Sequence, residues 1–258
     1  LGLGEKSPVV RVTATGAPVQ ASLQASITRT LVAGGVEQVG VAAVPGTAQV
    51  VPAFSVTRAP GAPGASDVGT MVRLLSPSAD ATATVTITPV GSGVPALEPQ
   101  TVPLTAGAPL EVELGGLQVG AYTARVESTA PVVAAVWSTT GFVEGADFAW
   151  YPAADAVTVP SLAAIADGPA PMLTIANGGD AGTVVRVVEA TGAGVIVDLA
   201  VPAGGSVQYP VQAGGVYQLI PADEPVHANV TYTGEGAVAS FVVTPADTAA
   251  APVVVYPG

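Results

Sequence analysis

The chain has 258 residues, a formal net charge of −12 and no cysteine. Only 10% of the residues are charged and they form no basic cluster, which argues against nucleic acid as a partner and disfavours docking on anionic lipid. Glycine and proline, with 31 and 24 residues, are too frequent for a helical bundle and suit short strands joined by tight turns. The long uncharged stretch at 199–222 contains Pro202, Pro210 and Pro221, so no membrane span is expected.

One short sequence motif, called here the proline phrase, occurs three times, at residues 18–23, 131–136 and 225–230. In each copy a proline is followed by small or branched apolar residues at every second position, the period of a strand with one buried face. Residues 1–46 hold the first copy without the segments that precede the other two, and we interpret them as the back half of a repeat. The Pro-, Gly- and Ala-rich segment at 58–69 is typical of a linker or long loop.

From residue 71 onward the strand signals become dense. Residues 82–88 alternate threonine with Ala83, Val85 and Ile87, which predicts a strand with one wet face and one buried face. The following segments alternate in the same way and predict strands at 110–114, 120–126 and 148–152.

The second half of the chain repeats this order of segments. At nearly constant spacing, 175–188 matches 75–88, 203–211 matches 106–114, 215–217 matches 120–122 and 241–245 matches 148–152. We therefore expect a partial β unit at 1–46, a first β-sandwich unit at 47–156 and a second at 157–258. Either the chain is a piece of a longer array, which we favour, or its terminal segments complete one another.

A unit of about 100 residues with seven or eight short strands has the size of an immunoglobulin-like sandwich. The sequence therefore predicts an all-β protein of tandem immunoglobulin-like β-sandwich domains. Tyr122 and Tyr217 lie in Gly-x-Tyr strands that resemble the tyrosine corner of such domains, where the phenol hydroxyl ties down a nearby loop. The alternative is a closed repeat of β-propeller type, but its period of about 40–50 residues is not seen.

Groups that catalysis would need are few. His227 is the only histidine, and the alternation places it on the polar side of its strand, where a catalytic base is not expected. Glu111 and Glu113 share one strand face at a separation of about 7 Å, which glycosidases can use, but a solvated strand face is the favoured interpretation. One histidine and no cysteine make a zinc site improbable. We expect that the chain is not an enzyme.

Calcium is the one cofactor that the sequence leaves open. Hard cations bind carboxylate and carbonyl oxygens in turns, and four aspartates fall in expected turns: Asp80, Asp147, Asp180 and Asp223. No EF-hand spacing occurs, and a turn aspartate usually bonds its own backbone. The expectation is therefore no cofactor, with calcium as the less favoured outcome.

Aromatic residues cluster once, between residues 137 and 151. Packing in the core or between domains is the favoured interpretation, with Phe148 and Trp150 filling the core, although Trp137 fits it less well. Flat aromatic rings also bind sugars, and exposed ones mark interaction sites. The alternative is therefore a ligand-binding surface made of Trp137, Phe142, Trp150 and Tyr151.

The blocks at 74–78 and 175–180, each of which runs into an alternating Thr/Val strand, carry a resemblance to a known family. Together with the Gly-x-Tyr strands and the repeated proline phrase, they resemble an uncharacterised family of actinobacterial secreted or envelope-anchored proteins built from tandem β-sandwich units. The resemblance covers 71–258, with 9–46 as a partial match. It implies an extracellular or cell-wall location and brings no catalytic residues.

These observations lead to one expected function and one alternative. We expect a non-enzymatic, exported structural or interaction protein that acts as a spacer or scaffold in the bacterial cell envelope, with an envelope glycan or protein as its partner. The alternative is a carbohydrate-binding module that uses the aromatic cluster.

Overall fold

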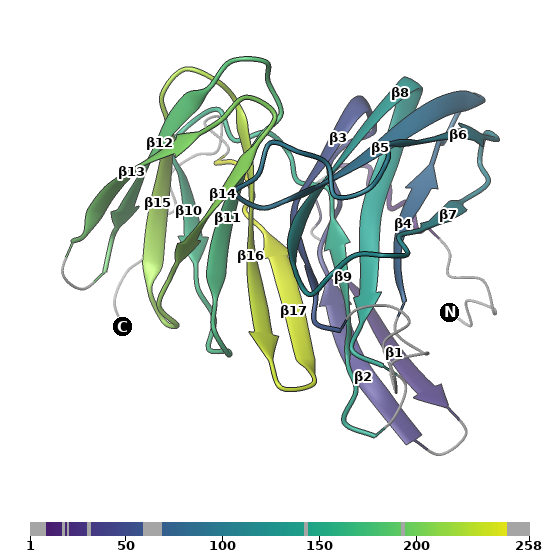
Figure 1. Cartoon of the computed structure of the whole chain (residues 1–258), viewed down its shortest axis with the longest axis horizontal. Coiled ribbons are helices and arrows are strands. Elements are labelled where there is room, and N and C mark those ends of the chain that lie inside the picture. Colours follow the sequence, from purple (N-terminus) through teal and green to yellow (C-terminus); the bar gives the residue numbers. More distant parts are fainter. Residues whose placement is uncertain are drawn as a thin grey trace.

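The computed structural model of the chain describes residues 9–16, 19, 21–29, 32–58, 69–141, 144–191 and 194–246. Within these ranges every regular element is a strand and the pairs are antiparallel, which confirms the predicted all-β class (Figure 1). Phe142, most of the expected linker at 58–69 and the segment 252–257 lie outside the described residues.

The first of two hydrophobic cores is enclosed by a sheet that folds back on itself into a nearly closed sandwich. Its strands are β3 (Gly46–Val56), β4 (Thr70–Leu75), β5 (Ala81–Pro89), β6 (Gln100–Leu104), β7 (Leu110–Glu113), β8 (Gly120–Thr139) and β9 (Phe148–Pro152). The long strand β8 belongs to both layers. Residues 120–128 pair with β3 and β5, whereas residues 133–139 pair with β4 and β9.

The second core lies between two separate four-stranded sheets. The strands are β10 (Ser161–Ala164), β11 (Met172–Asn177), β12 (Thr183–Glu189), β13 (Ile196–Val201), β14 (Ser206–Pro210), β15 (Val216–Pro221), β16 (Val226–Gly234) and β17 (Ala237–Val242). One sheet has the order β10-β15-β12-β13 and the other β14-β11-β16-β17. Strands β15 and β16 take the places of the two halves of β8, and each pairing of this sandwich has a counterpart in the first.

The alternation in the sequence places side chains as predicted along β5. Ala83, Val85 and Ile87 are buried in the core, while Thr82 is exposed and Thr84 and Thr86 are half-buried on the other face. Removing a Val or Ile side chain from water contributes roughly 1.5–3 kcal/mol, so this periodicity fixes the register of the strand.

Both expected tyrosine corners are present. The hydroxyl of Tyr122 donates a hydrogen bond to the carbonyl oxygen of Gln118 at 2.8 Å. The hydroxyl of Tyr217 accepts one from the backbone N–H of Gln212 at 3.0 Å. Each ring is buried in the core of its own sandwich, so each bond fixes the turn that precedes a central strand.

The structure corrects one detail of the sequence repeat. The matching of 241–245 with 148–152 would make Phe241 the counterpart of Phe148. The pairing registers instead set Tyr151 opposite Val136 and Phe241 opposite Val230, so Phe241 corresponds to Tyr151. The two matches differ because the connection from β8 to β9 is longer than the tight turn from β16 to β17.

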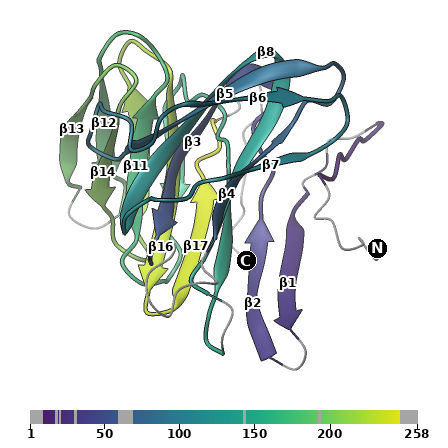
Figure 2. The ribbon, with the colours of Figure 1, turned by 45° about the vertical axis from the view of Figure 1, so that its right-hand side comes forward.

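A separate hairpin, β1 (Leu23–Arg29) and β2 (Val32–Val39), precedes the first sandwich and contacts it through β2 and β9 (Figure 2). Gly35 lies at the contact with a φ of +100°, and a Cβ there would meet the Oδ1 atom of Asp147. Strand β2 of the hairpin thus contacts β9 of the first sandwich, just as β9 contacts β17 of the second sandwich.

The two sandwiches meet along β3, whose residues from Gln49 to Val56 are buried. One face of β3 belongs to the first core, and the other contacts β11 and β16. The Nδ2 atom of Asn229 donates to the carbonyl oxygen of Ala53 at 2.7 Å, and the hydroxyl oxygens of Thr123 and Ser206 lie 2.7 Å apart. The junction is thus closed by buried hydrogen bonds between the sandwiches.

Candidate functional site

A cavity of roughly 270 Å³ opens at the junction of the sandwiches. The polar side chains that line it come from three strands and one turn: Gln49 on β3, Arg125 and Glu127 on β8, Glu224 before β16, and His227 on β16. Sequence analysis singled out His227 among these. The cavity is a candidate site because it gathers polar and titratable side chains from both halves of the chain.

His227 is held in the cavity as a neutral imidazole. Its Nδ1 atom lies 2.7 Å from the carbonyl oxygen of Ala154, which can only accept, so Nδ1 carries the proton and Nε2 a lone pair. Burial lowers the pKa of His227 below 6.5, while its bond to Ala154 acts in the opposite direction. The side chain points away from the core of the second sandwich, as the alternation predicts, but residues of the first sandwich cover it.

The lining of the cavity offers His227 no nucleophile among the described residues. In this part of the chain no serine, threonine or cysteine lines the cavity, so no hydroxyl or thiol from it lies beside the lone pair. The guanidinium group of Arg125 donates to the carbonyl oxygen of Gly178 at 2.8 Å and lies 3.9 Å from the carboxylate of Glu127. The bond to Gly178 ties the sandwiches together, whereas the contact with Glu127 lies within β8.

Gln49 was not expected from the sequence. Its Nε2 atom donates to the carbonyl oxygen of Val44 at 2.8 Å, while its buried Oε1 atom has no hydrogen-bond partner within the described part of the chain. The sequence did contain an indication of this role: Gln49 directly precedes the apolar run of β3, and a polar side chain in a buried strand needs hydrogen-bond partners.

The predicted aromatic surface divides in the structure. Trp137 on β8 and Trp150 on β9 lie directly opposite each other in the register, and both are half-buried on the outer face. The expectation that Trp150 fills the core is therefore wrong, because the alternation along β9 turns Tyr151 inward instead. Tyr151 points the other way, is fully buried and packs against Phe54 with ring centroids 6.4 Å apart. Phe142 lies outside the described residues. Two of the four residues are therefore brought together on one surface.

Arg73 packs against this aromatic pair. Its guanidinium carbon lies 4.6 Å from the ring centroid of Trp150, and the same group forms an ion pair with Glu111. A cation over an indole face is attractive, and because the side chain of Arg73 is only 10% exposed, it supports the indole of Trp150 from beneath. The contact of Arg73 could have been sought from the sequence, because Arg73 and Glu111 are opposite charges in two alternating segments, and the strands β4 and β7 place them opposite each other. Glu113 lies on the same exposed side of β7.

The candidate calcium aspartates do not converge. Asp80 accepts a hydrogen bond from the backbone N–H of Ala106 at 2.9 Å, and Asp147 accepts one from Val238 at 3.1 Å. Asp180 and Asp223 are exposed in separate turns. Across the described ranges no three His, Cys, Asp or Glu side chains gather closely enough to hold a metal ion.

One buried carboxyl group was not predicted. Glu37 on β2 is only 5% exposed, and burial, with Asp147 nearby, raises its pKa to about 8. A hydrogen bond from the backbone at Trp150 opposes this change. The contact between the hairpin and β9 therefore contains a carboxyl group that is protonated at neutral pH.

Residues 2–212 match the model of a family described as a family of unknown function, DUF5719. The chain belongs to this family. No curated protein and no solved structure matches it. This agrees with the expected membership of an uncharacterised family, and membership in DUF5719 assigns no activity to the junction cavity or to the aromatic pair. Among the described residues of this DUF5719 chain, no helix is long and apolar enough to cross a membrane.

Proposed function

We propose that the chain is a non-enzymatic structural or interaction protein of the actinobacterial cell envelope, in which tandem sandwich units at 47–156 and 157–258 serve as a spacer or scaffold. The observation that carries this proposal is β3, which is buried against its own core on one side and against the second sandwich on the other. A spacer needs a fixed angle between its units, and a strand shared in this way supplies it.

The polar chemistry of the junction supports the same function. His227, Arg125 and Asn229 each make a hydrogen bond to a backbone carbonyl of the other sandwich, at 2.7 to 2.8 Å. Side chains used in this way hold backbone in place. The resemblance noted in the sequence supports the proposed exported location, and fractionation of the native cells tests it: we expect the protein in the wall fraction.

A distance measurement between spin labels tests the rigid spacer. The chain has no native cysteine, so labels can be placed on the exposed side chains of Val94 in the first sandwich and Glu235 in the second through V94C and E235C. We expect one narrow distance distribution, as narrow as that of the control pair V94C and E113C within the first sandwich. A distribution several times broader than the control would contradict the spacer.

The aromatic pair favours a second function, carbohydrate binding. Trp137 and Trp150 lie side by side on one outer face, with Arg73 over one of the rings, and flat indoles stack on sugars. These are the two tryptophans of the chain, so its tryptophan fluorescence reports on this surface alone.

Titration with soluble cell-wall polysaccharide fragments tests this function. We expect saturable quenching, reduced at least tenfold in affinity by W150F and unchanged by L162A on the other sandwich. Unchanged fluorescence at millimolar fragment would exclude carbohydrate binding at this surface and leave the spacer proposal intact.

A further inference from the structure

The outer face of the β10-β15-β12-β13 sheet has the same position in the second sandwich as the junction face has in the first. β10 pairs with β15 as β3 pairs with β8, and Ala164 on β10 stands where Ser55 stands on β3. In the first sandwich this face is covered by the second, and Ser55 and Thr123 on it are no more than 5% exposed. In the second sandwich nothing among the described residues covers it.

This uncovered face, called here the open face, is more apolar than the covered one. The register aligns Leu162, Gln218, Val188 and Ile196 in one row across its four strands. Leu162 is 59% exposed, Ile196 is 63% exposed and Val184 is 42% exposed. The corresponding strands of the first sandwich present threonines, including Thr88 and Thr123. Leu162 and Ile196, at the two ends of this row, and Val184 beside it are exposed aliphatic side chains on a regular sheet, which indicates a surface that another surface covers.

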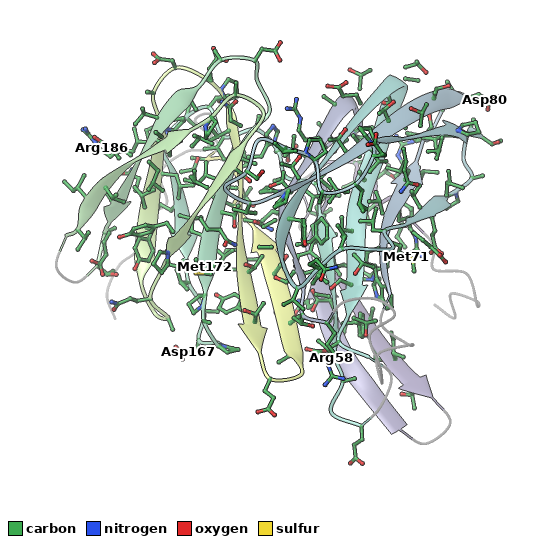
Figure 3. All side chains as sticks on the ribbon, in the orientation of Figure 1. Arg58, Met71, Asp80, Asp167, Met172 and Arg186 are labelled. Atoms are coloured by element: carbon green, nitrogen blue, oxygen red, sulfur yellow. The ribbon has the colours of Figure 1, made fainter. Side chains whose placement is uncertain are left out.

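Charge points to the kind of partner. The chain has a net charge of −12, which opposes contact between copies over most of its surface. The charged side chains that the strand register places on the open face are Arg186 and Asp198, which form a two-bond ion pair at 2.7 and 2.9 Å, whereas Glu189 at the end of β12 lies opposite the core residue Tyr217. Figure 3 shows Arg186 at the side of the molecule away from the first sandwich. Asp223, in the turn after β15, lies at the rim of this face beside Val184 and Ala200. The open face therefore carries little of the net charge of −12 and can approach a second copy of itself.

We propose that two copies of this chain pair through their open faces, sheet against sheet, about a two-fold axis. In this arrangement the apolar rows interdigitate, and Arg186 of each copy faces Asp198 of the other, as self-complementary contacts require. A head-to-tail arrangement would instead repeat the contact between the sandwiches, in which β9 touches β17, from one copy to the next. The β17 strand of one copy would then meet β9 of the other, where the β1–β2 hairpin already makes contact. Face-to-face pairing displaces no element that the structure describes. The inference deepens the proposed scaffold function, on which it rests, by naming its partner.

Sedimentation of the full chain from about 1 µM to about 1 mM tests the pairing. We expect the mean mass to rise with concentration towards twice the monomer mass, as for a weak standard-size interface. I196E places a carboxylate in the aligned row of the open face, on the edge strand β13, and should weaken the dimer at least tenfold. V94E is the matched control, because Val94 is 71% exposed in the first sandwich, and it should leave the dimer unchanged.

Charge exchange tests the two-fold geometry. R186D makes the open face doubly negative and D198R makes it doubly positive, so each variant alone should remain monomeric where the natural chain dimerises. An equimolar mixture should restore the dimer, because only face-to-face pairing brings the two altered faces together. A natural chain that stays monomeric up to 1 mM, or a dimer that resists I196E, would overturn the proposal. The spin-label distance within one chain is independent of both results, so failure of the pairing is distinguishable from failure of the scaffold.

Discussion

At the scale of single residues, the junction depends on polar side chains that face away from the core of their own strand. His227 follows Val226 in a strand whose alternate residues are fully buried, so the sequence correctly predicts its direction. The sequence does not show that a neighbouring sandwich covers that side. Periodicity reports which face of a strand is apolar, but the partner of the polar face is set by packing between units.

The junction should be sensitive to acid through His227. Its pKa is lowered in the folded protein, so the unfolded chain binds more protons than the folded one as the pH falls below 6.5, and stability must fall there. We expect the urea midpoint to decrease between pH 7.5 and pH 5, and H227Q to reduce this decrease. An equal decrease in H227Q would assign the acid sensitivity to other groups.

Glu37 should act in the opposite direction on the hairpin. Its pKa is raised from 4.5 to about 8, so the folded protein binds the extra proton and docking of the hairpin weakens as the pH rises through this window. Amide hydrogen exchange in β2 should therefore be faster at pH 8.5 than at pH 6 after correction for the intrinsic rate. E37Q should abolish the difference, and its persistence in E37Q would contradict the assignment.

At the scale of elements, the strands of the sandwiches could be predicted and their pairing partners only in part. The alternating segments gave β5, β7 and the start of β8, and the matching blocks gave the same order in both halves. The register of β17 was missed because a match between phenylalanines outweighed a difference in turn length. The double burial of β3 did have a signal: the nearly continuous apolar run at 50–56 is typical of a strand buried on both faces.

The hairpin β1–β2 offers a prediction at this scale. Gly35 and Gly16 have nearly the same positive φ, +100° and +98°, but a Cβ at Gly35 would lie 2.3 Å from Asp147 whereas one at Gly16 meets nothing within 4 Å. G35A should therefore release the hairpin and raise the exchange rate of β2, beyond the effect of backbone strain. G16A carries that strain alone and is the control. Equal effects of the two variants would show that the contact with Asp147 is unimportant.

At the scale of the whole molecule, the two cores should unfold together. Asn229 is fully buried, and its bond to the carbonyl oxygen of Ala53 crosses the junction. N229A leaves that carbonyl without a partner and should cost about 1–3 kcal/mol of unfolding free energy. In calorimetry we expect one transition for the natural chain and two for N229A.

Asn177 provides the control for this coupling. Its side chain bonds Ala181 and Gly179 within one turn of the second sandwich. N177A should lower the stability of that sandwich and still give a single transition. Two transitions already in the natural chain would contradict the coupling of the cores.

The position of β3 between two cores also affects how the chain folds during its synthesis. A ribosome delivers residues 46–139 well before residues 161–242, so the early half emerges with Pro52 and Ala53 facing water. The strands of the early half can form at once, but the outer face of β3 stays exposed until β11 and β16 of the later half have been made and cover it. Nascent chains stalled between these two points should therefore be the species most prone to stick to one another, and the ones that a chaperone would hold.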